Sequence, residues 1–124
     1  MTIQKQLLIA DRVRHPPTSG FSWVDRRFLH EFASRLSGDA MLLYFFLAAV
    51  SDKQGLSFYA DSSLAVRLKS SEGIIVRARN ELIDADLVAY QPPLTQVLSL
   101  PPAGIQRRQP PGTILHQLFK NGSP

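Results

Sequence analysis

The longest apolar run in the chain is the feature that most constrains its fold. Residues 40–50 read AMLLYFFLAAV and contain no charged side chain. As a helix this run spans about 16 Å, whereas the apolar core of a bilayer is about 30 Å thick. A helix that is apolar on nearly every side needs packing partners on every side. We therefore expect a helix over 40–52 to be the central core element of a globular domain, and we expect no membrane association.

Proline and glycine clusters set the predicted limits of that domain. One cluster fills residues 15–20, and two more begin at Pro101 and Pro110. Such clusters are typical of loops and linkers because they interrupt helices. The 124 residues have room for one domain. We predict a basic arm over 1–20, a folded domain over 21–100, and a proline-rich, basic and flexible tail over 101–124.

The net charge of +4 belongs to the two ends of the chain. Residues 1–20 carry a balance of +2 and residues 101–124 a balance of +3, whereas the residues between them carry −1. Basic ends indicate an anionic partner. The central domain is nearly neutral, so its own net charge offers no general attraction for such a partner.

Enzyme and metal sites find no support in the sequence. The chain has no cysteine, which excludes disulfides, iron–sulfur clusters and thiol catalysis and fits a reducing cytoplasm. Its histidines, His15, His30 and His116, have no metal-binding spacing, and no nucleophile elbow or glycine-rich phosphate loop is present. We therefore expect that the protein is not an enzyme and that it binds no cofactor, no metal and no small-molecule substrate. A signal peptide is not expected, because charged residues closely follow the short apolar run near the N-terminus.

Residue spacing predicts the other elements of the domain. Amphipathic patterns favour helices over 24–36, 62–69 and 72–85. β-favouring runs predict a strand over 56–59 and a hairpin of 87–91 and 94–100 around Pro92-Pro93. Helix caps are expected from Asp39, from Asp61 or Ser62, and from Ser70 or Ser71, with Gly55 ending the helix 40–52. The aromatic core is expected to include Trp23, Phe28, Phe32, Tyr44, Phe45, Phe46 and Phe58.

This order of elements, helix–helix–strand–helix–helix–hairpin, resembles the winged helix-turn-helix fold. The resemblance is most specific over 61–88, DSSLAVRLKSSEGIIVRARNELIDADLV. Leu64-Ala65 matches the pair that opens the first motif helix, Ser71 the start of the recognition helix, and Ile75 its hydrophobic anchor. Lys69 stands where a turn glycine is usual, and Arg79 where an aliphatic residue is common. The resemblance implies a mainly α, α+β domain of the bacterial or phage regulator or replication-initiator type.

The resemblance also implies where DNA would bind. In this fold the recognition helix enters the major groove. The implied contacts are Arg67 and Lys69 to phosphates, Ser71 and Gly73 at the helix start, and Arg77 and Asn80 to base edges. Helical spacing equally allows Arg77 to pair with Glu81, and Glu72 would repel phosphate. The wing tip 91–96 is uncharged and the domain is nearly neutral, so any DNA affinity would come from the cations of the motif and from the basic ends. The motif cations are Arg67, Lys69, Arg77 and Arg79, and the candidates in the basic ends are Arg12, Arg14, Arg107 and Arg108.

Two functions follow as hypotheses. The first is a DNA-binding protein, a small transcriptional regulator or a replication or mobile-element accessory, that recognises double-stranded DNA through residues 71–80. The alternative is a winged-helix adaptor that binds another protein through the apolar helix 40–52 or the neutral wing. The N-terminal helices offer a homodimer face as well, with some of Leu42, Phe45, Phe46 and Ala49 exposed in a monomer.

Overall fold

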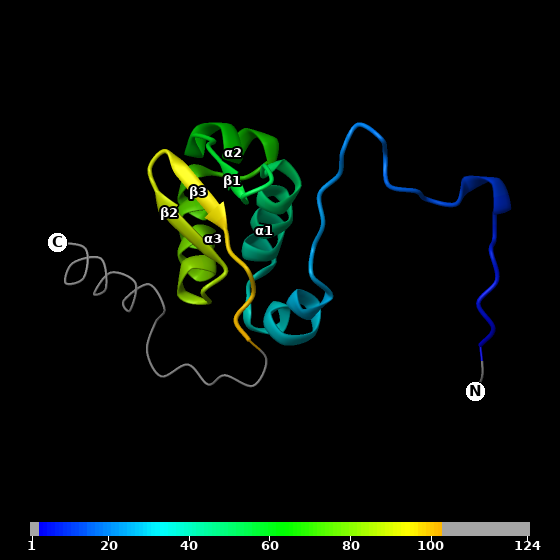
Figure 1. The fold of residues 1–124 in the computed structure, drawn as a ribbon. Coiled ribbons are helices and arrows are strands. Elements are labelled where there is room, and N and C mark those ends of the chain that lie inside the picture. The colour runs from blue at the N-terminus through cyan, green and yellow to red at the C-terminus, as the bar shows by residue number, and fades with distance from the viewer. Residues whose placement is uncertain (1–2, 103–124) are drawn as a thin grey trace.

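A computed structural model describes residues 3–102, and it shows a mixed α+β domain with a long N-terminal arm (Figure 1). Residues 103–124 of the tail predicted over 101–124, including Arg107 and Arg108, lie outside the described residues. The fold class expected from the sequence is confirmed at the level of helices with a small sheet. In chain order the elements are a short 3-10 helix in the arm (Ala10–Arg12), a helical segment over 26–35, α1 (Gly38–Val50), β1 (Leu56–Ser57), α2 (Asp61–Arg67), α3 (Glu72–Asp84), β2 (Val88–Gln91) and β3 (Leu94–Val97).

The helical segment over 26–35 is less regular than the predicted helix. It passes from α through π geometry over Phe28–Phe32 to a 3-10 turn over Ala33–Arg35. Asp25 begins it, since its carboxylate accepts from the Arg27 backbone N–H at 2.8 Å. Phe28 is fully buried and stacks on Tyr44 of α1, with ring centroids 4.1 Å apart. This contact fixes the segment against α1.

The three strands form one antiparallel sheet in the order β1–β3–β2. The predicted hairpin is present, with Val88 opposite Val97 and Gln91 opposite Leu94. Gly55 allows β1 to join it, because a Cβ at this position would lie 2.5 Å from the Val97 carbonyl oxygen. The prediction that Gly55 ends the preceding helix was wrong, since α1 ends at Val50 and Gly55 lies in the turn before β1.

The core lies between α1, α3 and the sheet (Figure 1). Leu43 of α1, Ile75 and Leu82 of α3, and Leu87 before β2 are its largest fully buried aliphatic side chains. Three predicted core aromatics are exposed instead, Trp23 by 74%, Phe58 by 70% and Phe45 by 36%. Ser57, the last residue of β1, is buried, whereas Phe58 lies just after the strand and faces solvent. Trp23 precedes the first helix and lies on the arm side of the domain.

Serines cap the two long helices. The Ser37 hydroxyl accepts from the Ala40 backbone N–H at 3.1 Å, so the prediction of Asp39 as the α1 cap was wrong by two residues. Ser71 caps α3 as predicted by accepting from the Ile74 N–H at 3.2 Å. α2 has Ala60 at its N-cap and no side-chain cap, which contradicts the prediction of Asp61 or Ser62. None of the helices within residues 3–102 has the length and apolarity needed to cross a membrane.

Candidate functional site

The segment from α2 to α3 positions every predicted contact of the central domain. α2 ends in two backbone bonds, from the Ser70 N–H to the Ala65 carbonyl at 2.7 Å and from the Lys69 N–H to the Val66 carbonyl at 3.2 Å. This pattern is a Schellman motif, whose penultimate residue adopts a left-handed conformation and is usually glycine. Lys69 holds that position with φ of 54°. The chain then enters α3 at Ser71, so the two helices are joined by a short turn.

Lys69 therefore adopts the conformation that the expected turn glycine would have. A side chain in the left-handed region costs about 1 kcal/mol relative to glycine. The Lys69 side chain is exposed to solvent, and no packing contact of the core requires it. The turn thus has the left-handed backbone conformation of a Schellman motif although lysine, and not glycine, stands at this position.

The two faces of α3 differ in burial. The inner face packs on α1 and α2 through Ile75, Ala78, Arg79 and Leu82. The outer face is open to solvent and carries six residues, Ser71, Glu72, Gly73, Val76, Arg77 and Asn80. These are the six residues that helical spacing assigns to the outer face. Four of the predicted site residues, Ser71, Gly73, Arg77 and Asn80, therefore lie on one surface, and Lys69 lies beside it.

Arg79 belongs to the core and not to this surface. Its side chain is 5% exposed, and its guanidinium forms an ion pair with Asp61 at the start of α2. It also lies 4.0 Å from the ring centroid of Tyr90 in β2. The grouping of Arg79 with the cations available to DNA was therefore wrong, because this arginine joins α2, α3 and the hairpin. Its partners are far away in sequence, so no local pattern identifies them.

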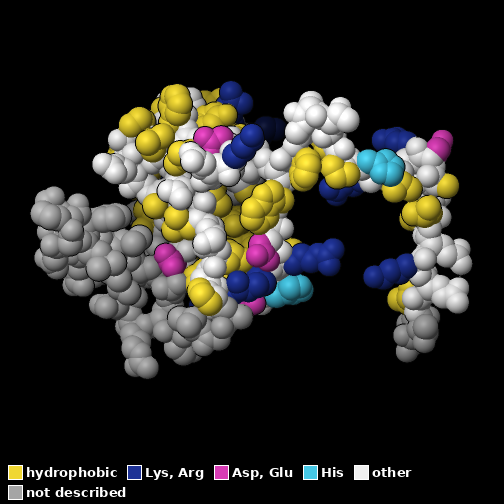
Figure 2. All heavy atoms as spheres, viewed as in Figure 1, with side chains coloured by type: hydrophobic (Ala, Val, Ile, Leu, Met, Phe, Trp, Pro, Cys, Tyr) yellow, Lys and Arg dark blue, Asp and Glu magenta, His cyan; other side chains and the backbone are white. Residues whose placement is uncertain are grey.

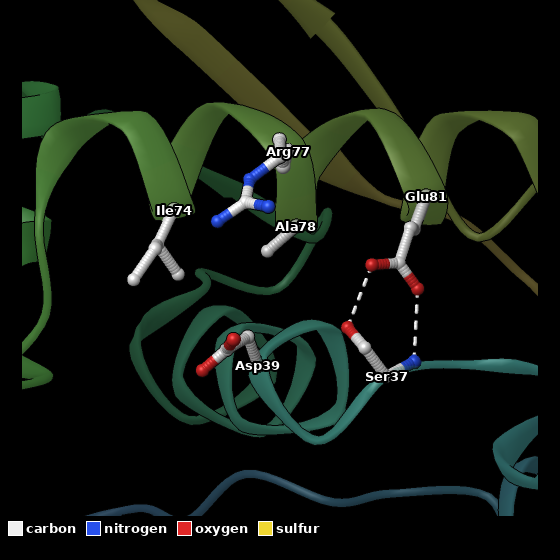
Figure 3. Close-up of a pocket in the computed structure, with 6 residues that line it drawn as sticks. All are labelled: Ser37, Asp39, Ile74, Arg77, Ala78 and Glu81. Carbon is white, nitrogen blue, oxygen red and sulfur yellow. Dashed lines mark hydrogen bonds between the residues drawn. The ribbon is translucent and has the colours of Figure 1, made fainter.

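Arg77 lies at the edge of a pocket between α3 and the first turn of α1 (Figure 3). The empty volume is about 300 Å³, and Figure 3 shows Arg77 and Asp39 on opposite helices across it. The lining residues are Ser37, Asp39, Ile74, Arg77, Ala78 and Glu81. Arg77 is exposed, and the ion pair with Glu81 that helical spacing allows is not among the ion pairs of residues 3–102.

Glu81 instead joins α3 to the start of α1. Its two carboxylate oxygens accept from the Ser37 hydroxyl at 2.6 Å and from the Ser37 backbone N–H at 2.8 Å (Figure 3). These hydrogen bonds lower the pKa of Glu81 below its usual value, and the nearby positive charge of Arg77 contributes less. Because Glu81 is held by Ser37, the guanidinium of Arg77 stays available to another anion.

The remaining residues predicted to contact DNA lie in two places, at the end of α2 and on the N-terminal arm. Arg67 is exposed at the end of α2, where its guanidinium lies 5.5 Å from the Tyr59 ring centroid. Arg12 and Arg14 lie on the arm, away from α3, and both are exposed (Figure 1). Glu72 places negative charge at the N-terminal end of α3. The outer surface near the motif is therefore mixed in charge, with cations at its edges.

No match was found when the chain was compared with known protein families, with curated proteins and with solved structures. Within the described range 3–102, no three histidine or acidic side chains come together in a way that would hold a metal ion. The contacts that hold this surface in place were not predicted from the sequence. Asp61 and Tyr90 contact Arg79, and Ser37 binds Glu81.

Proposed function

We propose that this chain is a winged helix-turn-helix protein that binds double-stranded DNA through the outer face of α3. The proposal rests on one observation about α3. Its outer face is open to solvent, whereas its inner face is packed in the core. Such a helix presents Arg77 and Asn80 to a partner without any rearrangement of the fold. The element order and the sheet order β1–β3–β2 agree with a winged-helix assignment.

The dimensions of α3 suit a DNA groove. Its thirteen residues make a rod about 20 Å long. The major groove is about 12 Å wide and admits one α-helix. Gly73 and Arg77 lie in the N-terminal half of α3, the part that approaches base edges in this mode of binding. Arginine pairs with the guanine edge and asparagine with the adenine edge, so Arg77 and Asn80 are the proposed base-reading residues.

The turn before α3 supplies the proposed phosphate contacts. The Ser71 oxygen accepts from Ile74 within the cap, which leaves the hydroxyl proton to donate to a phosphate. Lys69 projects from a backbone position where glycine would be less strained. A phosphate contact gives a physical reason for a lysine at this position. Arg67, Arg12 and Arg14 would add contacts to the backbone of the duplex.

A second function is favoured by a different observation. Apolar side chains gather over α2 and the tip of the β2–β3 hairpin (Figure 2). Val66 of α2 and Leu94 at the start of β3 are exposed, and the hairpin tip carries no charge. An exposed apolar group of this kind is typical of a protein-binding surface. The alternative proposal is an adaptor that binds another protein through this surface and not DNA.

A salt titration separates the two proposals. We expect the full chain to bind a duplex of random sequence at about 50 mM salt, with a log–log slope between about −3 and −6 as the motif and the arm release counterions. Arg77→Ala should weaken binding, and Arg26→Ala, an equal charge change at the start of the first helical segment, should weaken it less. Absence of binding at low salt, or affinity that is independent of salt, would contradict the DNA-binding proposal and favour the adaptor.

A further inference from the structure

One side of α1 is apolar and largely exposed within residues 3–102, although the Phe45 ring on this side meets Phe28 edge-on, with ring centroids 5.4 Å apart. The core side of the helix buries Leu43, Tyr44 and Leu47. The opposite side carries Leu42, Phe45 and Ala49, which recur at helical spacing and form one exposed stripe. Leu42 is 47% exposed. A helix on the surface of a monomer normally carries polar side chains there. We call these three residues the α1 stripe.

The arm over 3–21 is a second apolar surface that the domain does not cover. It leaves the domain beside the end of the stripe, where the Ser22 hydroxyl donates to the Ala49 carbonyl at 2.8 Å. It then turns, so that open space separates it from the domain (Figures 1 and 2). Its exposed apolar side chains include Leu8, which is 97% exposed, and the others are Ile3, Leu7, Ile9, Val13 and Phe21.

We propose that the partner of both surfaces is a second copy of this chain. In this dimer the two α1 stripes pack on each other about a twofold axis, and the arm of each copy passes around the other copy. The pairing goes beyond DNA binding and does not depend on it.

Charge favours a second copy over an unrelated partner. A twofold interface brings each surface patch against itself, so a charged patch would repel its own copy. The segment 40–51 contains no charged residue, and the α1 stripe is therefore able to pair with itself without repulsion. Leu29 of the preceding helical segment is exposed as well, and it offers further apolar area.

The length of the arm fits the same arrangement. Nineteen residues reach about 60 Å when fully extended, and the short 3-10 helix Ala10–Arg12 in the arm shortens this by only about 4 Å. A compact domain of about 80 residues has a diameter of about 30 Å. The arm is therefore long enough to cross a whole second domain seated against α1, and its apolar side chains would be covered along the way. The open space between the arm and the domain is the place that such a copy would occupy.

The test is the mass of the full chain in solution, measured by sedimentation or light scattering without DNA. We expect twice the chain mass of 13.8 kDa at micromolar concentration. Leu42→Lys should raise the dissociation constant of the dimer at least about tenfold. The combined change Leu7→Ser, Leu8→Ser and Ile9→Ser should also weaken the dimer, and these residues make no contact on which the folded domain depends.

The matched control is Val66→Lys, which places the same charge on an exposed apolar position of α2 and should leave the dimer intact. Circular dichroism checks that each variant is folded. A wild-type chain that stays monomeric would overturn the proposal. A dimer that resists both Leu42→Lys and the arm changes would overturn it as well, because neither surface would then be part of the interface.

Discussion

Two arginines on α3 show how one helix performs two tasks. Arg77 and Arg79 are two positions apart, so they lie on opposite faces. Arg79 is buried, paired with Asp61 and stacked on Tyr90, and it holds the hairpin and α2 to α3. Arg77 is exposed at the edge of a pocket. The same type of side chain is structural on one face and available for binding on the other, and the difference comes from position alone.

The largest expected effect on stability comes from a substitution on the inner face of α3. Leu82 is fully buried, so Leu82→Ala should lower the free energy of unfolding by about 3 kcal/mol, through lost burial and the cavity that remains. Val76→Ala on the outer face should change it by less than about 0.5 kcal/mol. Urea denaturation measures both values. Equal losses would contradict the division of α3 into a core face and an open face.

The next effect concerns the ion pair between Arg79, which is buried, and Asp61, which is partly exposed. Arg79→Ala leaves the Asp61 carboxylate without its partner and removes the contact with the Tyr90 ring, so we expect a loss of about 2 kcal/mol in unfolding free energy. The double change Asp61→Ala with Arg79→Ala should cost less than the sum of the single changes, because no unpaired charge remains. Strict additivity in this cycle would show that the pair contributes nothing to stability.

Lys69→Gly should have effects of opposite sign on stability and on binding. Glycine relieves the left-handed backbone at φ of 54°, and part of the gain is offset by the greater freedom of glycine in the unfolded chain. We expect unfolding to become less favourable by about 0.5 kcal/mol while the affinity for duplex DNA falls. Lys69→Arg keeps the charge and should retain the affinity. If Lys69→Gly bound DNA as well as the wild type, Lys69 would have no phosphate contact.

The smallest effect is a dependence on pH. The pKa of Glu81 is lowered in the folded chain by the hydrogen bonds from Ser37, so this carboxylate stabilises the fold at pH values above its unfolded pKa. That stability is lost as the pH falls from the unfolded value of about 4.5 through the lower folded pKa. Glu81→Gln should therefore make the unfolding free energy less sensitive to pH in this acidic range. Glu31, whose pKa is lowered by its hydrogen bond from Arg27, should preserve part of the dependence.

Much of this fold is readable from short-range pattern. Helical spacing predicted both faces of α3, and Ser71 was recognisable as its cap because capping acts within three residues. The hairpin was predicted from β-favouring runs on either side of Pro92-Pro93. The apolar run of α1 identified a core helix, and of the four residues named as partly exposed in a monomer, Leu42, Phe45 and Ala49 are exposed whereas Phe46 is partly buried.

Long-range contacts account for what the sequence did not show. Arg79 looked like one more surface cation, because Asp61 and Tyr90 reach it only through the packing of three elements. Ser37 and Glu81 are 44 positions apart, so their pairing has no local signature. Phe58 was assigned to the core from its residue type, whereas it lies just after the two-residue strand β1 and is exposed. Residue type predicted burial where periodicity supported it and failed where it stood alone.

The most direct test of the central claim is the DNA preference of Arg77→Ala. Sequences that bind the full chain can be selected from a pool of random duplexes, and the affinity for the best sequence is then compared with the affinity for a scrambled one. We predict that Arg77→Ala loses about 1–3 kcal/mol on the selected sequence and most of the preference over the scrambled one, whereas Arg26→Ala keeps the preference. Preference that is unchanged in Arg77→Ala would contradict the claim that the outer face of α3 reads DNA.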